Sequence, residues 1–147
     1  MAKFVFRLQS YLGVKEQVEE LKKNEYGQAI RRLEEEKQKK RLLELELSEM
    51  VAIFKESLEK AIKPVDIRRY NNRIELLKVL IVEQEKRIEA AEIYVEEKRL
   101  ELVEAMKERK ALETVKDRNF EEYLKDEQRE EQRIVDGLVS YQWAMNN

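Results

Sequence analysis

The chain contains no histidine and no cysteine among its 147 residues. Without histidine it lacks the commonest general base, the usual zinc ligand and every catalytic triad that uses imidazole. Without cysteine it forms no disulfide, thiolate metal site or thiol nucleophile, which fits a reducing compartment. A glycine-rich phosphate loop is also absent. We therefore expect that the protein is not an enzyme and has no catalytic, cofactor-binding or metal site.

Helix breakers are scarce, with only three glycines and one proline. Charged residues make up 42% of the chain, and richness in Glu, Lys, Arg and Leu is typical of long solvated helices. No apolar run approaches the ~20 residues of a membrane span, and the start of the chain is too quickly charged for a secretory signal. The sequence predicts a cytosolic all-α protein. Its net charge of −2 predicts no bulk attraction to nucleic acid or to an anionic membrane.

A repeat of alternating three- and four-residue steps runs through the second half of the chain. Only three of its positions are not apolar, namely Gln84, Lys98 and Arg109. A repeat sustained over so many heptads indicates the seam of a left-handed coiled coil. The seam consists of Ile67, Tyr70, Ile74, Leu77, Ile81, Gln84, Ile88, Ala91, Val95, Lys98, Leu102, Ala105, Arg109 and Leu112.

The first half carries a rougher version of the repeat. Tyr26, Ile30 and Leu33 begin it, and a second group resumes it downstream. Between the two groups the seam turns polar, around Lys37 to Arg41, and we expect a locally loosened or re-phased coil there. The basic residues of this stretch lie between glutamates, so we interpret them as a solvated helix face. The downstream group is Leu43, Leu47, Met50, Phe54, Ser57 and Ala61.

Pro64 is the only proline and lies between the two halves. Proline cannot continue a helix and disfavours helical dihedrals at the preceding residue, and Asp66 is placed to cap the next helix. A short connector makes neighbouring helices antiparallel, so we predict a two-stranded coiled-coil hairpin. One continuous kinked helix that dimerises is the alternative. The predicted boundaries are a single domain over 1–147, helix 1 over about 2–62, a tip at about 63–66 and helix 2 over about 66–136.

The second arm is longer than the first, at about 80 residues against about 60. A terminal overhang, residues 126–147, therefore has no partner on the first arm, and Gly137 is placed to end or interrupt its helix. Three interpretations stay open for its apolar residues: binding of a partner, folding back on the first helix, or a disordered tail. These residues are Ile134, Val135, Leu138, Val139, Tyr141, Trp143 and Met145.

The apolar residues at the start of the chain, Phe4, Phe6, Leu8 and Leu12, have two interpretations. In the first they form a helix that lies on a membrane surface. In the second they pack as core against the second arm near Phe120 and Leu124, and we favour this interpretation.

Segments at both ends and near the tip resemble the FliJ family of flagellar export proteins. Phe4–Leu12, followed by Glu16, resembles the family's N-terminal signature, and Tyr70–Ile74 with Leu77 resembles the opening of its second helix. Lys107–Glu113 and Glu131–Asp136 resemble its C-terminal pattern, although Gly137 stands where the family usually has an acidic residue. The resemblance covers nearly the whole chain.

The resemblance implies a non-enzymatic, stalk-like rod, similar to the central stalk of rotary ATPases. It implies a place in the cytoplasmic part of the flagellar type III export apparatus, at the inner face of the cell membrane. The implied partners are the hexameric export ATPase, which the helix ends stimulate, the membrane-embedded export-gate protein, contacted near the tip, and export chaperones. We expect no nucleic acid or small-molecule substrate, and a free protein that is a monomer or a weak homodimer.

The resemblance also implies contact residues. Tyr70 and Leu77 fall on the seam as coil core, whereas Arg73 and Leu80 lie off it, where exposure is expected. The implied export-gate contact at the tip consists of Tyr70, Arg73, Leu77, Leu80 and Gln84. The implied ATPase contact at the terminal end consists of Phe4, Phe6, Arg7, Arg133, Ile134, Leu138, Tyr141 and Trp143. From the heptads alone a second hypothesis stays open, a structural coiled-coil spacer or dimerisation protein without an ATPase partner.

Overall fold

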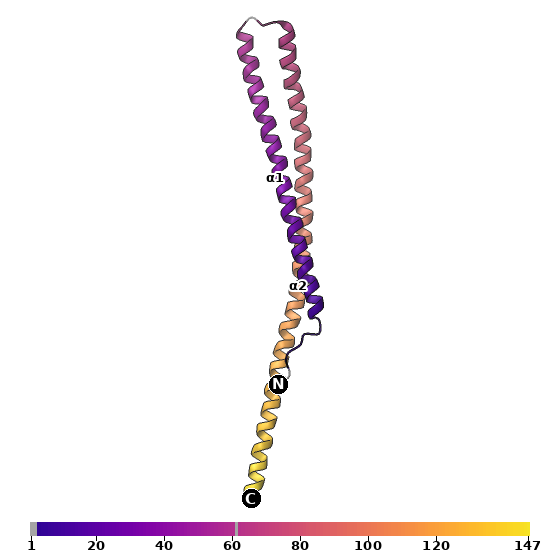
Figure 1. The fold of residues 1–147 in the computed structure, drawn as a ribbon, viewed down its shortest axis with the longest axis vertical. Coiled ribbons are helices and arrows are strands. Elements are labelled where there is room, and N and C mark those ends of the chain that lie inside the picture. The colour runs from indigo at the N-terminus through magenta and orange to yellow at the C-terminus, as the bar shows by residue number, and fades with distance from the viewer. Residues whose placement is uncertain (1–2, 61) are drawn as a thin grey trace. The chain divides into compact units, whose positions relative to one another are not determined.

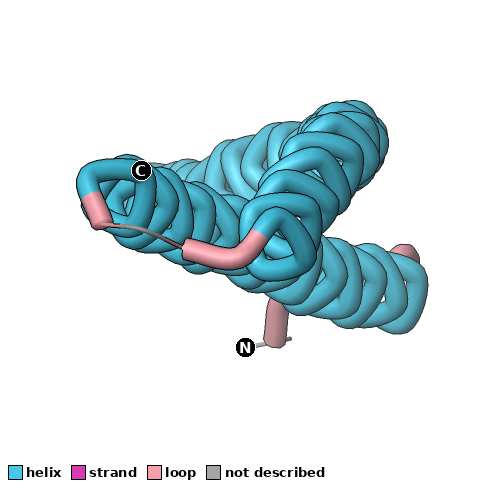
Figure 2. The backbone as a smooth tube through the Cα atoms, turned by 90° about the horizontal axis from the view of Figure 1, so that it is seen from above, coloured by secondary structure: helices cyan, strands magenta, loops and turns pink. Residues whose placement is uncertain are grey.

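The computed structural model describes residues 3–60 and 62–147, and two long helices account for nearly all of them. Helix α1 spans Gln9–Glu59 and helix α2 spans Pro64–Asn146. The two helices pack against each other in opposite directions as a helical hairpin (Figure 1). The predicted all-α hairpin is confirmed. Loops occur at the connector and ahead of α1 (Figure 2).

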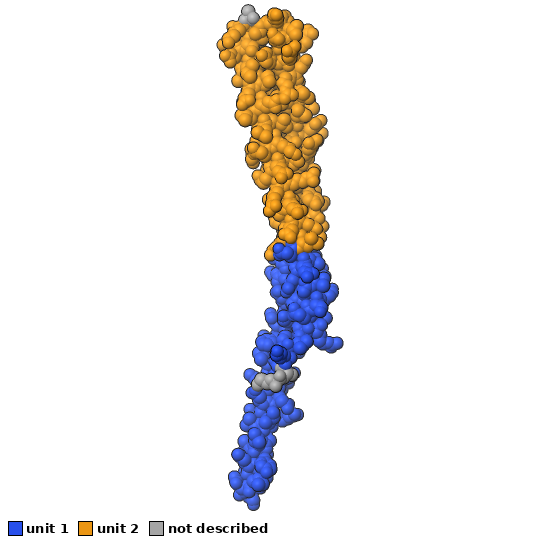
Figure 3. All heavy atoms as spheres, viewed as in Figure 1, with its two compact units in different colours: residues 1–20, 103–147 blue, residues 21–102 orange. Residues whose placement is uncertain are grey.

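The chain divides into two compact units, where the sequence predicts one domain over residues 1–147. One unit is residues 21–102, which contains the connector and the paired parts of α1 and α2 beside it. The other unit is residues 1–20 with 103–147 (Figure 3).

The seam of α2 is confirmed at every predicted position. All fourteen residues from Ile67 to Leu112 are buried or half-buried, and Leu77 is fully shielded from solvent. By contrast, Val79 and Val82, which lie between seam positions, are more than half exposed. The apolar face that the heptads define is therefore the face that α2 turns towards α1.

The predicted loosening of the first arm around Lys37 to Arg41 is wrong. The steps of three and four run along α1 without a slip, because Ala29 rather than Ile30 occupies the seam and the polar Glu36 and Lys40 continue it. Every seam residue of α1 is buried or half-buried. The seam of α1 is Leu12, Lys15, Glu19, Lys22, Tyr26, Ala29, Leu33, Glu36, Lys40, Leu43, Leu47, Met50, Phe54 and Ser57. Ala61, which the sequence adds to it, lies outside the described residues.

The connector places proline inside the second helix and not ahead of it. Pro64 is the first residue of α2, a position where the missing N–H loses no helical hydrogen bond. The backbone carbonyl of Lys63 accepts from the backbone N–H groups of Asp66 at 3.0 Å and Ile67 at 3.3 Å. Asp66 therefore lies in the first turn, where its charge favours the helix dipole, and is not the cap that the sequence predicts.

The chain enters α1 through an extended segment, so the predicted helix start near residue 2 is too early, and Ala2 itself lies outside the described residues. Phe4 and Phe6 turn inwards and Val5 outwards, which is the two-residue alternation of extended chain. The Phe4 ring lies 5.2 Å from that of Phe120, centroid to centroid. This contact and the burial of Phe6 and Leu12 confirm the predicted core packing for these residues, whereas Leu8 is 43% exposed and does not take part in it.

Helix α2 continues through Gly137 to Asn146, so the predicted end near Asp136 is also wrong. A glycine inside a helix costs only about 1 kcal/mol relative to alanine, and no proline follows to stop the helix. The overhang does not fold back, because every residue from Gln128 onwards is exposed.

Truncation of Leu77 tests the seam. Leu77→Ala is expected to lower the free energy of unfolding by about 2–4 kcal/mol, because it removes a fully buried side chain and leaves a cavity. Val79→Ala, two residues away on the exposed face, is expected to change it by less than about 0.5 kcal/mol. Urea titration followed by circular dichroism measures both values, and equal effects would contradict the register.

Candidate interaction surfaces

The polar seam position Gln84 is satisfied by a buried glutamate of α1. The Nε2 group of Gln84 donates to the backbone carbonyl of Glu36 at 2.9 Å and also to the Glu36 carboxylate. Both residues are more than nine-tenths shielded, at 5% and 9% exposure. A buried carboxylate is tolerated only when it is hydrogen-bonded, so this pair fixes which residue of α2 lies opposite Glu36.

The other two polar seam positions of α2 also meet glutamates. The Lys98 ammonium lies 3.3 Å from Glu25 of α1 and 3.1 Å from Glu101 of its own helix. Arg109 forms an ion pair with Glu19 across the seam and another with Glu113 at 2.8 Å. Each exception to the apolar seam is therefore a polar layer in which α1 supplies the carboxylate.

The electrostatics of these layers follow from their hydrogen bonds. Donation by Gln84 holds the pKa of Glu36 below its ordinary value of 4.5 against the opposing effect of burial, and Lys39 and Arg87 add to the lowering. The hydrogen bond to Glu101 raises the pKa of Lys98. Both groups therefore stay charged near neutral pH, which is the behaviour of structural ion pairs and not of an acid–base catalyst.

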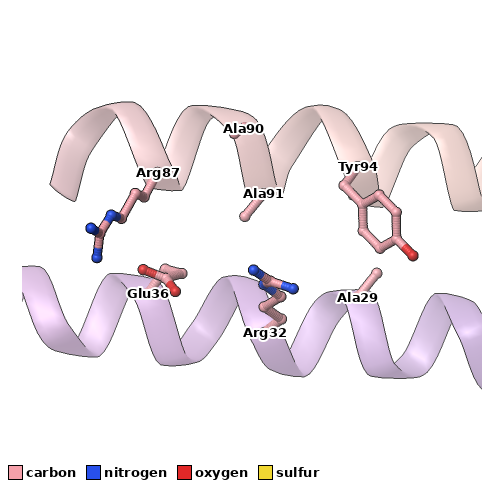
Figure 4. Close-up of a pocket in the computed structure, with 7 residues that line it drawn as sticks. All are labelled: Ala29, Arg32, Glu36, Arg87, Ala90, Ala91 and Tyr94. Atoms are coloured by element: carbon pink, nitrogen blue, oxygen red, sulfur yellow. The ribbon is translucent and has the colours of Figure 1, made fainter. Parts of the chain in front are cut away.

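A hollow of about 420 Å³ lies beside Glu36 between α1 and α2 (Figure 4). Three alanines line it together with the side chains of Arg32, Arg87 and Tyr94. The only carboxylate that lines it is Glu36, which Gln84 and Lys39 already engage. The hollow therefore holds no unengaged acid–base pair. Its remaining lining residues are Ala29, Ala90 and Ala91.

The structure separates the implied tip residues into two groups. Leu77 and Gln84 lie inside the coil, and half-buried Tyr70 has its ring centroid 6.4 Å from that of Phe54. Arg73 is exposed and forms an ion pair with Glu46. Leu80, expected to be exposed, is half-buried because it lies beside the seam. Among these five residues, Arg73 and parts of Tyr70 and Leu80 are therefore open to a partner.

The implied terminal residues also divide. Phe6 is buried and Phe4 half-buried at the start of the chain, whereas Arg7 is exposed. The overhang presents its side chains to solvent, and its exposed large apolar residues include the only tryptophan. Arg133 is exposed and pairs with Glu130 at 2.9 Å. The exposed apolar residues are Ile134, Val135, Leu138, Val139, Tyr141, Trp143 and Met145.

The overhang carries a heptad-spaced apolar stripe of its own, one residue out of phase with the seam of α2, whose alternating steps lead to Arg133, Gly137, Ser140 and Ala144. Ile134, Leu138, Tyr141 and Met145 follow one another at steps of four, three and four, the spacing that α2 uses against α1. All four are more than half exposed. The overhang is thus a helical stripe of coiled-coil type that no part of the described chain covers.

The sequence matches the family described as Flagellar FliJ protein over residues 4–147. The chain belongs to the FliJ family. No curated protein matches it. Among solved structures it is similar to a putative YscO homologue from Chlamydia trachomatis, with 19% identity, a TM-score of 0.47 and 99% of each chain covered.

As a member of the FliJ family, the chain is a non-catalytic component of the flagellar export apparatus. Within residues 3–60 and 62–147, no group of three or more histidine, cysteine, aspartate or glutamate side chains is arranged to hold a metal ion. Across the same residues no helix has the length and apolar character to cross a membrane. What the FliJ fold offers is therefore surface for partners: the tip, the overhang and the outer faces of the coil.

Acid should weaken the Glu36 layer. Because the pKa of Glu36 is lower in the folded chain than its ordinary 4.5, the carboxylate stabilises the fold above that pH and loses this effect as the pH falls through the lowered value. The free energy of unfolding is expected to fall as the pH drops below the ordinary value of 4.5, and to fall less in Glu36→Gln. Urea titrations at each pH measure this difference.

The exposed Glu35→Gln removes the same charge from the outer face and serves as the control, with an acid response like that of the unaltered chain. Some fall should remain in Glu36→Gln, because hydrogen bonds from Arg99 and Lys98 also lower the pKa values of Glu96 and Glu101. If Glu36→Gln and the unaltered chain respond to acid identically, the Glu36 layer does not stabilise the fold as described.

Proposed function

We propose that this protein is a stalk that binds and stimulates the flagellar export ATPase through its terminal overhang, contacts the export gate near the tip, and helps to handle export chaperones. In this proposal it acts in the cytoplasm, peripheral to the inner face of the cell membrane at the flagellar base. The observation that carries the ATPase contact is the exposed apolar stripe of the overhang, Ile134, Leu138, Tyr141 and Met145.

The chemistry of the overhang supports burial against a partner. Residues 137–147 contain no charged side chain, although 42% of the whole chain is charged. Solvated helix faces in this protein, including residues 126–136 of the overhang, are dense in charged side chains, and only its last eleven residues depart from that rule. Exposed aromatic residues such as Tyr141 and Trp143 are the kind that anchor protein interfaces.

The start of the chain contributes less than its implied role suggests. Phe4 and Phe6 face α2, so their part in an ATPase contact is to hold the base of the overhang and not to touch the ring. Arg7 and Arg133 are exposed, and Arg133 directly precedes Ile134 of the apolar stripe. We therefore assign direct contact to Arg7, Arg133, Ile134, Leu138, Tyr141 and Trp143.

The same reasoning narrows the proposed export-gate contact. Leu77 and Gln84 cannot reach a partner without opening the coil. Arg73 is exposed and remains available, and half-buried Tyr70 and Leu80 are each available in part. For chaperones, the outer face of α2 offers the exposed apolar side chains of Val79 and Val82 and, eleven residues further on, Ile93.

Removal of the overhang tests the ATPase contact. A chain that ends at Asp126 is expected to keep its helical hairpin, because no residue after it is shielded except half-buried Glu127, and to lose stimulation of the purified export ATPase. Circular dichroism verifies the fold, and phosphate release measures stimulation. Full stimulation by the shortened chain would overturn the proposal.

A matched pair at Gly137 tests whether the overhang acts as a helix. A side chain at this position meets nothing within 4 Å, so neither variant clashes with the chain. Gly137→Ala should retain stimulation, whereas Gly137→Pro, which breaks a helix interior at a cost of about 3 kcal/mol, should reduce it. If the unaltered chain binds no ATPase, as well as the two Gly137 variants, and light scattering shows that it is a stable dimer, the chain is a structural spacer instead.

A further inference from the structure

The hairpin tip concentrates positive charge that the whole-chain balance hides. Residues 60–73 contain five basic side chains and one acidic one, Asp66, a net charge of +4. Since the whole chain carries −2, the remaining residues carry −6. We call the five basic residues the basic cap: Lys60, Lys63, Arg68, Arg69 and Arg73.

Most of the basic cap is free to meet an external anion. Lys63, Arg68 and Arg69 are exposed and form no ion pair with any described residue. Lys60 approaches Glu56 at 3.8 Å, but both side chains are at least 70% exposed, and such surface pairs are weak. Only Arg73 has a close partner, Glu46. This contrasts with the seam, where the basic residues Lys98 and Arg109 are neutralised across the coil.

Apolar side chains lie among these cations. Val65, directly after Pro64, is 65% exposed, and Ile62 in the connector is half-buried. The cations come from the residue after the end of α1, from the connector and from the first turns of α2, so no single helix face carries them all. Cations beside apolar side chains suit an anionic membrane surface, where lysine and arginine reach headgroups and an apolar side chain meets the acyl boundary.

We propose that the basic cap binds the anionic headgroups of a lipid bilayer. The distribution of charge favours this partner over a nucleic acid, which a stripe of cations along one face would track. The distribution of charge also favours lipid over a single acidic protein segment. The exposed cations belong to separate parts of the chain and do not line a groove that such a segment could occupy. The contact is peripheral, and it does not depend on the ATPase contact of the proposed function.

Vesicle flotation tests the basic cap. The full chain is mixed with vesicles of phosphatidylcholine containing about 30% phosphatidylserine, or of phosphatidylcholine alone. Binding is expected only to the anionic vesicles and should weaken at about 0.5 M salt, because screening shortens the range of the attraction. The variant Lys63→Gln/Arg68→Gln/Arg69→Gln is expected to bind about a hundredfold more weakly, since each charge near such a surface contributes about fivefold.

The control variant Lys107→Gln/Lys110→Gln/Arg118→Gln removes the same charge from exposed positions elsewhere on α2. It should bind the anionic vesicles as the unaltered chain does. Equal losses in both variants would show that overall charge and not the tip governs binding, which overturns the proposal. The proposal also fails if the unaltered chain does not float, or if the tip variant loses binding to the purified export-gate protein while it still binds lipid. Because no ATPase is present, these outcomes are separate from those of the stimulation assay.

Discussion

The pairing of Gln84 with Glu36 constrains the hairpin more than any apolar contact does. An apolar heptad repeat alone tolerates a slip by seven residues, since leucine meets leucine in either register. A slip of one heptad here would place the buried Glu36 carboxylate opposite Leu77 or Ala91 and leave it without its hydrogen bond. An unpaired buried charge is strongly destabilising, so one register is selected. Lys98 and Arg109 constrain the register in the same way, because each forms an ion pair with a glutamate of α1.

This constraint explains what the sequence could predict about the fold. The seam of α2 is readable because eleven of its fourteen positions are apolar, and all fourteen are shielded. The seam of α1 is not readable around Glu36 and Lys40, because a polar residue at a seam position cannot be told from a solvated one until its partner is known. Ile30 looks like core by size, yet Ala29 occupies the seam, since position along the repeat decides burial. Helix ends were misjudged where backbone geometry decides: Pro64 begins α2 and Gly137 does not end it.

The sequence predicts the overhang surface better than it predicts the tip surface. The overhang follows from counting residues on either side of Pro64, and its apolar composition stands out in the sequence. The tip residues implied by the family resemblance include both exposed and buried side chains. A sequence pattern cannot tell whether Leu77 packs inside the coil or contacts a partner. Its complete burial assigns it to packing. The charge of the tip is visible in the sequence, but a net charge of −2 for the whole chain conceals it.

The two ends of α2 therefore differ in the chemistry they offer. Its first turns carry unpaired cations, and its last turns carry no charge at all. Binding through charge acts at a distance of about a Debye length, responds to salt and tolerates many geometries. Binding through an apolar seam needs close contact, changes little with salt and selects a partner helix or groove by shape. Since the polar layers hold α1 and α2 in one register, neither kind of binding needs to open the coil. Under the proposed function, a partner at the tip and a partner at the overhang would thus bind and dissociate separately, the first in response to salt and the second through shape.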